Sequence, residues 1–187
     1  MSVGLVGSEM CIRDSITTRG FRDVLEMRRR DRPKTWGLWG TFAPVVERKN
    51  RLEVSERTLA DGTIRVSVDE KEVENCAKIL MENGCSAVCL FFINGYANSE
   101  NEKRAAKVLR SIWPNNHVSI ATEILPEIRE FERCSTATLN AYLQPPVANY
   151  LERLETRISN EKKKSEILIV QSNGAVSYTH LRAHETN

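Results

Sequence analysis

The chain has 187 residues and a mass of 21.3 kDa, which is enough for one ordinary domain that needs no disulfide to bury its core. Hydrophobic residues make up 41% and charged residues 28%, and these values exclude the disordered and collagen-like classes. A net charge of +2 gives no electrostatic case for nucleic acid or an anionic membrane surface. The longest apolar run, Ala87–Ile93, is far shorter than the ~20 residues of a membrane-spanning helix.

The five cysteines form an odd set without the paired spacings of a zinc site or the density of a secreted scaffold. We therefore expect a reducing, cytoplasmic location. Cys85 and Cys89 fall in a predicted strand, where four residues span about 13 Å, so they cannot hold one metal ion. The cysteines are expected to act as small apolar packing groups, and no metal site is predicted.

Both ends of the chain resemble translated sequencing-adapter read-through. Residues 1–15 lack the basic start, sustained apolar stretch and cleavage site of a signal peptide. Residues 175–187 show no helical or strand period and hold two of the three histidines. We expect both segments to be artefacts and leave them out of the fold prediction.

The first predicted elements are a short helix and a hairpin. Ile16–Met27 places its apolar residues on one face after a possible N-cap, Thr18. Farther on, Leu52–Val54 and Ile64–Val68 alternate between apolar and polar residues on either side of the turn Leu59–Gly62. This pattern predicts a β-hairpin.

Two helix starts follow from a capping-box pattern, in which a capping side chain precedes a glutamate by three residues. The first pairs Asp69 with Glu72 and ends at Asn83, and the second pairs Ser99 with Glu102 and ends before a proline. A third, longer helix is predicted after Pro126, reaching about residue 160 with an interruption at the Pro145-Pro146 pair. Apolar runs predict buried strands at Cys85–Ile93, His117–Thr122 and Glu166–Val170.

Strands that alternate with helices require right-handed crossovers and a mostly parallel sheet. The predicted fold class is therefore α/β, with a mostly parallel sheet, covering helices and the hairpin as an antiparallel addition.

The most pointed candidate site is Gln171-Ser172-Asn173-Gly174, which directly follows a predicted buried strand. Open α/β sheets place ligands at the carboxyl ends of their strands, and an amide, a hydroxyl and a glycine N–H offer both donors and acceptors. The alternative is an ordinary Asn-Gly hairpin turn.

A second candidate is the charged stretch that contains Glu127, Arg129, Glu130 and Arg133. Carboxylates at helical spacing can bind a metal ion or relay a proton. The alternative is a salt-bridged surface face, in which Glu130 and Arg133 are neighbours three residues apart.

Other chemistry finds little support in the sequence. No glycine-rich phosphate loop and no G-x-S-x-G elbow is present, and His117 is the only histidine outside the suspect ends. Arg28–Trp39 mixes cations with aromatic residues that could stack on bases. That stretch keeps open a non-catalytic module that binds nucleic acid or a partner subunit.

Seven ordered motifs nevertheless resemble the hydantoinase A and 5-oxoprolinase family, and the similarity covers residues 16–174. The motifs are Thr17–Glu26, Arg32-Pro33, Glu56-Arg57 with Asp61-Gly62, Tyr96–Asn98 with Glu102, Leu125–Arg133, Asn140–Pro145 and Gln171–Gly174.

The resemblance implies an ATP-dependent amidohydrolase that opens a cyclic amide such as a hydantoin or 5-oxoproline, on an actin-like or sugar-kinase-like ATPase architecture; related members serve in ATP-driven carboxylases. It also implies ATP and a divalent metal ion for the parent protein, whose glycine-rich motifs DxGGTFTD and SGPAAG are missing from this sequence. We therefore expect an internal, inactive fragment. Residues 16–133 would be the C-terminal part of the family's N-terminal domain, and residues 134–174 the start of its core domain.

The same resemblance implies that Ser172, Asn173 and Gly174 line the ligand cleft and that Glu127, Arg129, Glu130 and Arg133 support it; no catalytic residue is assigned. The expected partners are a small cyclic amide and a second hydantoinase-type subunit in a homo- or hetero-oligomer, without nucleic acid or membrane. The chain could also serve only as an interface piece for that second subunit.

Overall fold

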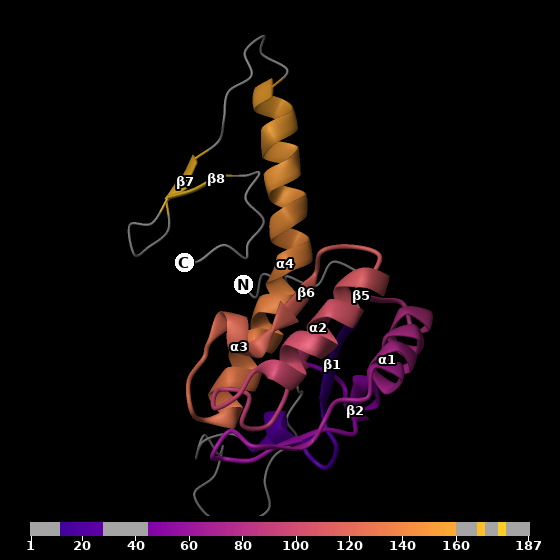
Figure 1. Cartoon of the computed structure of the whole chain (residues 1–187). Helices are drawn as coiled ribbons and strands as arrows, with labels where there is room; N and C mark the ends of the chain where they lie inside the picture. The colour runs from indigo at the N-terminus through magenta and orange to yellow at the C-terminus, as the bar shows by residue number, and fades with distance from the viewer. Residues whose placement is uncertain (1–11, 28–44, 160–167, 171–175, 179–187) are drawn as a thin grey trace, which may run out of the picture. The chain divides into compact units, whose positions relative to one another are not determined.

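The computed structural model of the chain describes residues 12–27, 45–159, 168–170 and 176–178 (Figure 1). The chain divides into two compact units, Met1–Gln144 and Pro145–Asn187, and each is described by itself. The Arg28–Trp39 stretch, which was predicted to mix cations with aromatic residues in a possible binding module, lies outside the described residues.

A four-stranded parallel sheet forms the centre of the first unit. Its strand order is β2-β1-β5-β6, and every neighbouring pair is parallel. The expected α/β class with a mostly parallel sheet is therefore confirmed. The strands are β1 (Ile12–Thr18), β2 (Arg51–Val54), β5 (Cys85–Phe91) and β6 (Val118–Ile120).

Helices cover both faces of this sheet, which explains why β5 is an almost unbroken apolar run. Val88 and Leu90 belong to one buried cluster with α1 (Glu70–Glu82) and α2 (Glu100–Ile112). On the opposite face of the sheet, Cys89 and the neighbouring buried side chains of β5 belong to a second cluster, which also contains residues of α4 (Glu130–Ser159).

The helix predicted at Ile16–Met27 is wrong. Residues 12–18 form the inner strand β1, and only a 3-10 turn, Val24–Glu26, follows. Thr18 is the last strand residue and not an N-cap. Ile16 is fully buried between Leu52 and Leu90 in the register, so pairing on both sides outweighs the local helical period. Residues 12–15, which the fold prediction omitted, form the first half of this strand.

The predicted hairpin is confirmed only in its second half. Arg57–Thr58 (β3) pairs antiparallel with Ile64–Val66 (β4). The residues expected to form the first hairpin strand instead form β2, which joins the central sheet parallel to β1. Alternation of apolar residues cannot distinguish a hairpin strand from a sheet-edge strand, because both have one covered face.

Both predicted helix starts are confirmed, but their glutamates do not act as expected. The Asp69 side chain accepts a hydrogen bond from Lys71 N at 2.9 Å, whereas the Ser99 hydroxyl makes no capping bond. Asn98 Oδ1 accepts from Glu100 N instead, at 3.0 Å. Glu72 bonds to Ser55 and Arg19, and Glu102 points into the core.

The long helix begins later than predicted. A short helix, α3 (Ala121–Ile124), comes first, and α4 starts at Glu130 and not at Pro126. Arg129 has φ +94°, a left-handed conformation that cannot continue a helix turn. Pro145 and Pro146 lie inside α4, so the expected interruption is wrong for the secondary structure, although the boundary between the two units falls directly before Pro145.

The second unit contains β7 (Leu168–Val170) and β8 (Val176–Tyr178), which pair antiparallel in their own two-stranded sheet. The strand predicted at Glu166–Val170 is therefore confirmed over Leu168–Val170, but the expectation that it joins the parallel sheet is wrong. Its partner β8 lies in the segment 175–187 that the prediction omitted. Among the described helices, none is long and apolar enough to cross a membrane.

Candidate functional site

The carboxyl ends of β1 and β5 are the place where this sheet could receive a ligand. The strand order reverses there, because β1 connects outward to β2 on one side while β5 and β6 lie on the other. Open α/β sheets bind ligands at such a switch point. The residues that leave these two strands therefore decide whether the crevice is open or filled.

Polar side chains fill this crevice. Thr18 Oγ1 accepts a hydrogen bond from Ile93 N at 3.0 Å, which joins the ends of β1 and β5. The same hydroxyl donates to Glu56 Oε1, and Asn101 Nδ2 donates to Glu56 Oε2 at 2.9 Å. These side chains are at least 96% buried. Burial raises the pKa of Glu56, and the hydrogen bonds from Thr18 and Asn101 lower it.

The β3–β4 hairpin is held over this cluster by side-chain amides. Asn101 Nδ2 also donates to Val66 O at 3.0 Å, and its Oδ1 accepts from Val68 N at 3.0 Å. Asn94 Nδ2 donates to Thr58 O at 3.0 Å. Because the amides satisfy backbone groups that would otherwise be buried without partners, the hairpin is an integral part of the edge.

Glu102 is the second buried carboxylate at this edge. Its Oε1 accepts from Phe92 N at 2.8 Å, and its Oε2 accepts from Thr122 N at 3.0 Å and from the Thr122 hydroxyl. Burial raises the pKa of Glu102, while the Thr122 and Phe92 bonds and the charge of Arg133 lower it. Glu102 therefore ties Phe92, directly after β5, to Thr122 in the short helix α3 that follows β6.

Arg133 completes the edge from α4 and is fully buried. It donates from Nη2 to Phe92 O at 2.9 Å and from Nη1 to Glu127 O at 3.0 Å. Its guanidinium lies 5.1 Å from the centre of the Phe91 ring and 5.5 Å from that of Tyr96, within the range of cation–π attraction. Arg133 thus holds the β5 end and the segment before α4 together.

The structure brings together only part of the predicted site. Arg133 lies within 3.6 Å of Glu130 as an ion pair, as the surface-face alternative expected for this spacing, but the arginine is buried. The side chains of Glu127 and Arg129 are exposed. Ser172, Asn173 and Gly174 lie outside the described residues. Within the described part of the chain, no group of three or more His, Cys, Asp or Glu residues could hold a metal ion.

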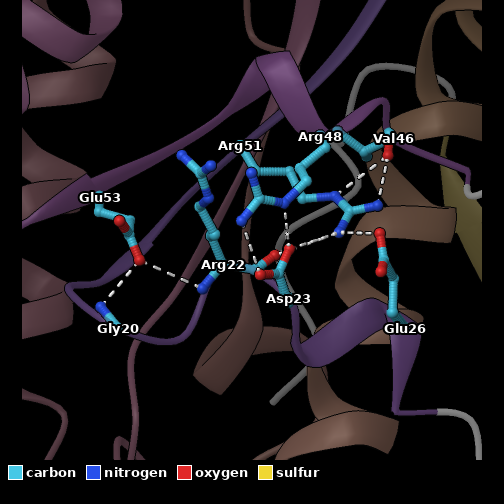
Figure 2. A network of polar contacts seen from close by, with 8 residues as sticks. All are labelled: Gly20, Arg22, Asp23, Glu26, Val46, Arg48, Arg51 and Glu53. Carbon is cyan, nitrogen blue, oxygen red and sulfur yellow. Dashed lines mark hydrogen bonds and ion pairs between the residues drawn. The ribbon is translucent and has the colours of Figure 1, made fainter.

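A second polar network fixes the segment that follows β1 (Figure 2). Glu53 Oε1 accepts from Gly20 N at 2.8 Å and from Arg22 N at 3.4 Å. Gly20 has φ +87°, which favours glycine. Arg48 forms two hydrogen bonds to Asp23, at 2.9 and 3.0 Å, and they hold the pKa of Asp23 below its usual value.

Arg51 is the buried centre of that network (Figure 2). Its guanidinium donates to Val46 O at 2.9 and 3.1 Å, to Arg22 O at 3.3 Å and to Glu26 at 3.0 Å. One arginine therefore joins residues on both sides of the 28–44 segment. The sequence analysis did not predict this role for Arg51. It did single out the run Thr17–Glu26, which contains two of the partners of Arg51, Arg22 and Glu26.

The described glycines do not form a nucleotide cradle. A Cβ on Gly62 would lie 3.2 Å from Ala97 O, and one on Gly95 would lie 3.0 Å from Thr122 Cγ2. These glycines permit close packing of the edge, and the N–H of Gly20 already bonds to Glu53. Among the residues that the structure describes, these glycines offer no triphosphate cradle, so no catalytic step through ATP is derived for them.

Comparison with known proteins relates the chain to one family. A family model described as the hydantoinase/oxoprolinase N-terminal region matches residues 15–113, and one described as hydantoinase/oxoprolinase matches residues 133–185. An uncharacterized protein of Methanocaldococcus jannaschii is 36% identical, over 87% of this chain and 24% of that protein. The caprolactamase subunit alpha of Pseudomonas jessenii is 28% identical, over 87% and 24%. The 5-oxoprolinase of Saccharomyces cerevisiae is 26% identical, over 86% and 14%.

Solved structures show the same fold. The ATP-dependent caprolactamase from Pseudomonas jessenii superimposes with a TM-score of 0.78 at 27% identity, over 89% of this chain and 24% of that chain. Nucleotide-free acetone carboxylase gives a TM-score of 0.71 at 20% identity, over 91% and 26%. The chain thus spans about a quarter of the length of these solved relatives.

Proposed function

Because the chain belongs to the hydantoinase/oxoprolinase family, we propose that it is a segment of a longer enzyme that opens a small cyclic amide by ATP-dependent hydrolysis. The observation that carries the proposal is the match of the two family models to residues 15–113 and 133–185. Relatives that bear the names caprolactamase and 5-oxoprolinase support the substrate class. A hydantoin or 5-oxoproline is the substrate to test first.

The proposed role of this segment is to supply a rigid wall of the enzyme and not its nucleotide site. The filled crevice between β1 and β5 supports this role, since its carboxylates are buried and bonded to protein donors. ATP and a divalent metal ion would be held by other parts of the parent, and the segment alone would be inactive. Ser172, Asn173 and Gly174 would line the amide cleft, with Glu127, Arg129, Glu130 and Arg133 as its support.

Assembly with a second subunit is part of the proposal. Two relatives are named as subunits, caprolactamase subunit alpha and acetophenone carboxylase gamma subunit, which supports a hetero-oligomer. The four described cysteines are free and buried, a pattern that suits a reducing, cytoplasmic location.

The decisive experiment measures ATP hydrolysis by the purified full-length parent with and without a hydantoin or 5-oxoproline, in the presence of a divalent metal ion. Either amide is expected to stimulate phosphate release, with the ring-opened acid as the product. The 187-residue chain is the matched control and should release no phosphate above background. Absence of stimulation by both amides would remove the substrate assignment.

The site assignment has its own test in the same parent. Asn173→Ala is expected to lower turnover while leaving the melting temperature nearly unchanged. Arg133→Met is the contrasting variant, and it should lower the melting temperature because it removes three buried guanidinium contacts. If Asn173→Ala instead lowers the melting temperature with little loss of turnover, Asn173 is a turn residue and not a cleft residue.

A further inference from the structure

The side chain of Arg22 lies beside a network of paired charges (Figure 2). Both oxygens of Asp23 bond to Arg48, at 2.9 and 3.0 Å, and Glu26 bonds to the buried Arg51 at 3.0 Å. Within the part of the chain that the structure describes, the Arg22 guanidinium forms neither an ion pair nor a hydrogen bond. The neighbouring acids are therefore used by the other two arginines.

The backbone of Arg22 is fixed from two sides, which limits where its side chain can reach. Its N–H donates to Glu53 Oε1 at 3.4 Å, and its carbonyl accepts from Arg51 Nη1 at 3.3 Å. Glu53 also accepts from Gly20 N at 2.8 Å, so this carboxylate serves the backbone and not the guanidinium. Arg22 is only partly exposed. Because a cation that loses water without gaining a counter-ion is unfavourable, the position favours binding of an anion.

Arg57 is a second cation of this kind, at the start of β3. Its guanidinium lies 5.1 Å from the centre of the ring of Phe21, the residue before Arg22, within the range of cation–π attraction. Glu56 precedes Arg57 in the chain, but both of its oxygens are bonded inside the buried cluster. Among the described residues, the partly exposed Arg57 side chain forms no ion pair and no hydrogen bond.

Phe21 places both arginines near the carboxyl end of β1. Its N–H donates at 3.0 Å to the carbonyl of Thr18, the last residue of that strand. The crevice of the switch point is filled, so a ligand that reaches this end of the sheet meets its rim. The planar fork of N–H donors on arginine suits carboxylate and phosphate groups. Two partly buried arginines without a described counter-ion give this rim the chemistry of an oxyanion site.

We propose that Arg22 and Arg57 bind a compact oxyanion, either the carboxylate of a cyclic amide substrate or the phosphate released by ATP cleavage. The source of the oxyanion rests on the proposed function, but the site itself does not. If the carboxylate is bound, the parent discriminates by charge: 5-oxoproline binds more tightly than 2-pyrrolidinone, which has the same ring without the carboxylate.

Isothermal titration calorimetry on the full-length parent, without ATP, tests the site with two probes, inorganic phosphate and 5-oxoproline. In both Arg22→Gln and Arg57→Gln, the Kd of at least one probe should rise about 10-fold, as expected for the loss of a charged hydrogen bond. The matched control is Arg65→Gln, an exposed arginine on β4 of the same hairpin. It should change each Kd by less than about 2-fold, because exposed charges are screened.

The probe that responds identifies the oxyanion. A weaker Kd for 5-oxoproline, with no change for 2-pyrrolidinone, assigns the carboxylate, and a weaker Kd for phosphate alone assigns phosphate. The proposal would be overturned by a parent that binds neither probe, by unchanged Kd values in either glutamine variant, or by an equal loss in Arg65→Gln. Equal losses for 5-oxoproline and 2-pyrrolidinone would also overturn it.

Lysine variants keep the test valid if a glutamine variant does not fold. Arg22→Lys and Arg57→Lys retain the charge but lose the fork of donors, so each should weaken binding by a smaller factor than glutamine, and unchanged binding would contradict the site. Because no turnover is measured, a parent without amide-stimulated ATP hydrolysis would remove the proposed function and leave the phosphate titration interpretable.

Discussion

Two carboxylates in the first unit are equally buried, yet their surroundings differ completely. Glu102, at the carboxyl edge of the sheet, is 1% exposed and accepts hydrogen bonds from two backbone N–H groups and one hydroxyl. Asp14, in the middle of β1, is also 1% exposed, but neither oxygen has a hydrogen-bond partner among the described residues. Burial of a carboxyl group therefore does not by itself mean that the group belongs to a hydrogen-bond network.

The difference shows in protonation. Burial raises the pKa of Asp14 to about 7, and the Cys85 thiol beside it lowers the pKa without offsetting that effect. At Glu102 several donors and the Arg133 charge oppose the effect of burial. The carboxyl edge is thus a satisfied network, whereas the centre of β1 carries an uncompensated acid. The following predictions test this contrast, from the largest expected effect to the smallest.

Replacing Glu102 with leucine should have the largest effect. The Phe92 and Thr122 donors lose their acceptor and Arg133 loses a nearby opposite charge, so the free energy of unfolding should fall by about 3–5 kcal/mol. Chemical denaturation followed by circular dichroism measures the change. Glu100→Leu, on the exposed side of the same helix, is the control and should change stability by less than about 0.5 kcal/mol. A loss of similar size in both variants would contradict the network.

Replacing Asp14 with leucine should stabilise the chain. The only donor that the carboxylate would lose is the weak Cys85 thiol, and its ionisation at pH 8 costs up to about 4 kcal/mol for a pKa shift from 3.8 to about 7. We expect a gain of about 2–4 kcal/mol in the free energy of unfolding at pH 8. Glu82→Leu, at the exposed end of α1, should bring no comparable gain. Destabilisation by Asp14→Leu would show that the acid has a partner after all.

The pH dependence of the free energy of unfolding tests the same difference between Asp14 and Glu102, and it does so without a large change in packing. The folded-state pKa of Asp14 is raised, so the stability from its neutral form is complete below pH 3.8 and is lost as the pH rises to about 7. Stability should therefore fall across this window. In Asp14→Leu the slope should become shallower but not vanish, because Glu56 and Glu102 also have raised pKa values. Denaturant midpoints at pH 4 to 8 measure both slopes.

The smallest effect is expected at the N-termini of α1 and α2, where one capping side chain makes a hydrogen bond and the other does not. Asp69 accepts a hydrogen bond from Lys71 N, and Ser99 caps nothing with its side chain. Asp69→Ala should therefore cost about 1 kcal/mol, and Ser99→Ala should cost only a few tenths. Equal losses would mean that the two caps contribute through propensity and not through the hydrogen bond.

Much of the first unit was predictable because its elements carry strong local signals. The helices after Asp69 and Ser99 follow their caps and apolar periods, and β5 follows its continuous apolar run. The prediction failed at β1, where the pattern of residues 16–27 is helical on its own. Pairing with β2 and β5 is a long-range interaction that no local window contains.

The candidate site was less predictable for the same reason. Glu56, Asn101 and Glu102 are separated by up to 46 residues in the chain, and only the meeting of β1, β5 and the hairpin brings them together. Arg133 was singled out by its charged neighbourhood, but its burial under Phe91 and Tyr96 depends on where α4 packs. Ser172, Asn173 and Gly174 lie outside the described residues, and Asn173→Ala tests the assignment of Asn173.

By itself, the sequence determined the α/β class, the starts of the helices after Asp69 and Ser99, the buried central strand and the family resemblance, because these depend on short-range periods and ordered motifs. The tertiary structure alone decided which strand lies beside β1, which carboxylates are satisfied and which face of α4 stays exposed. Those outcomes depend on groups that are far apart in the chain. The free energy of their interaction is established only when folding brings them together and removes the water between them.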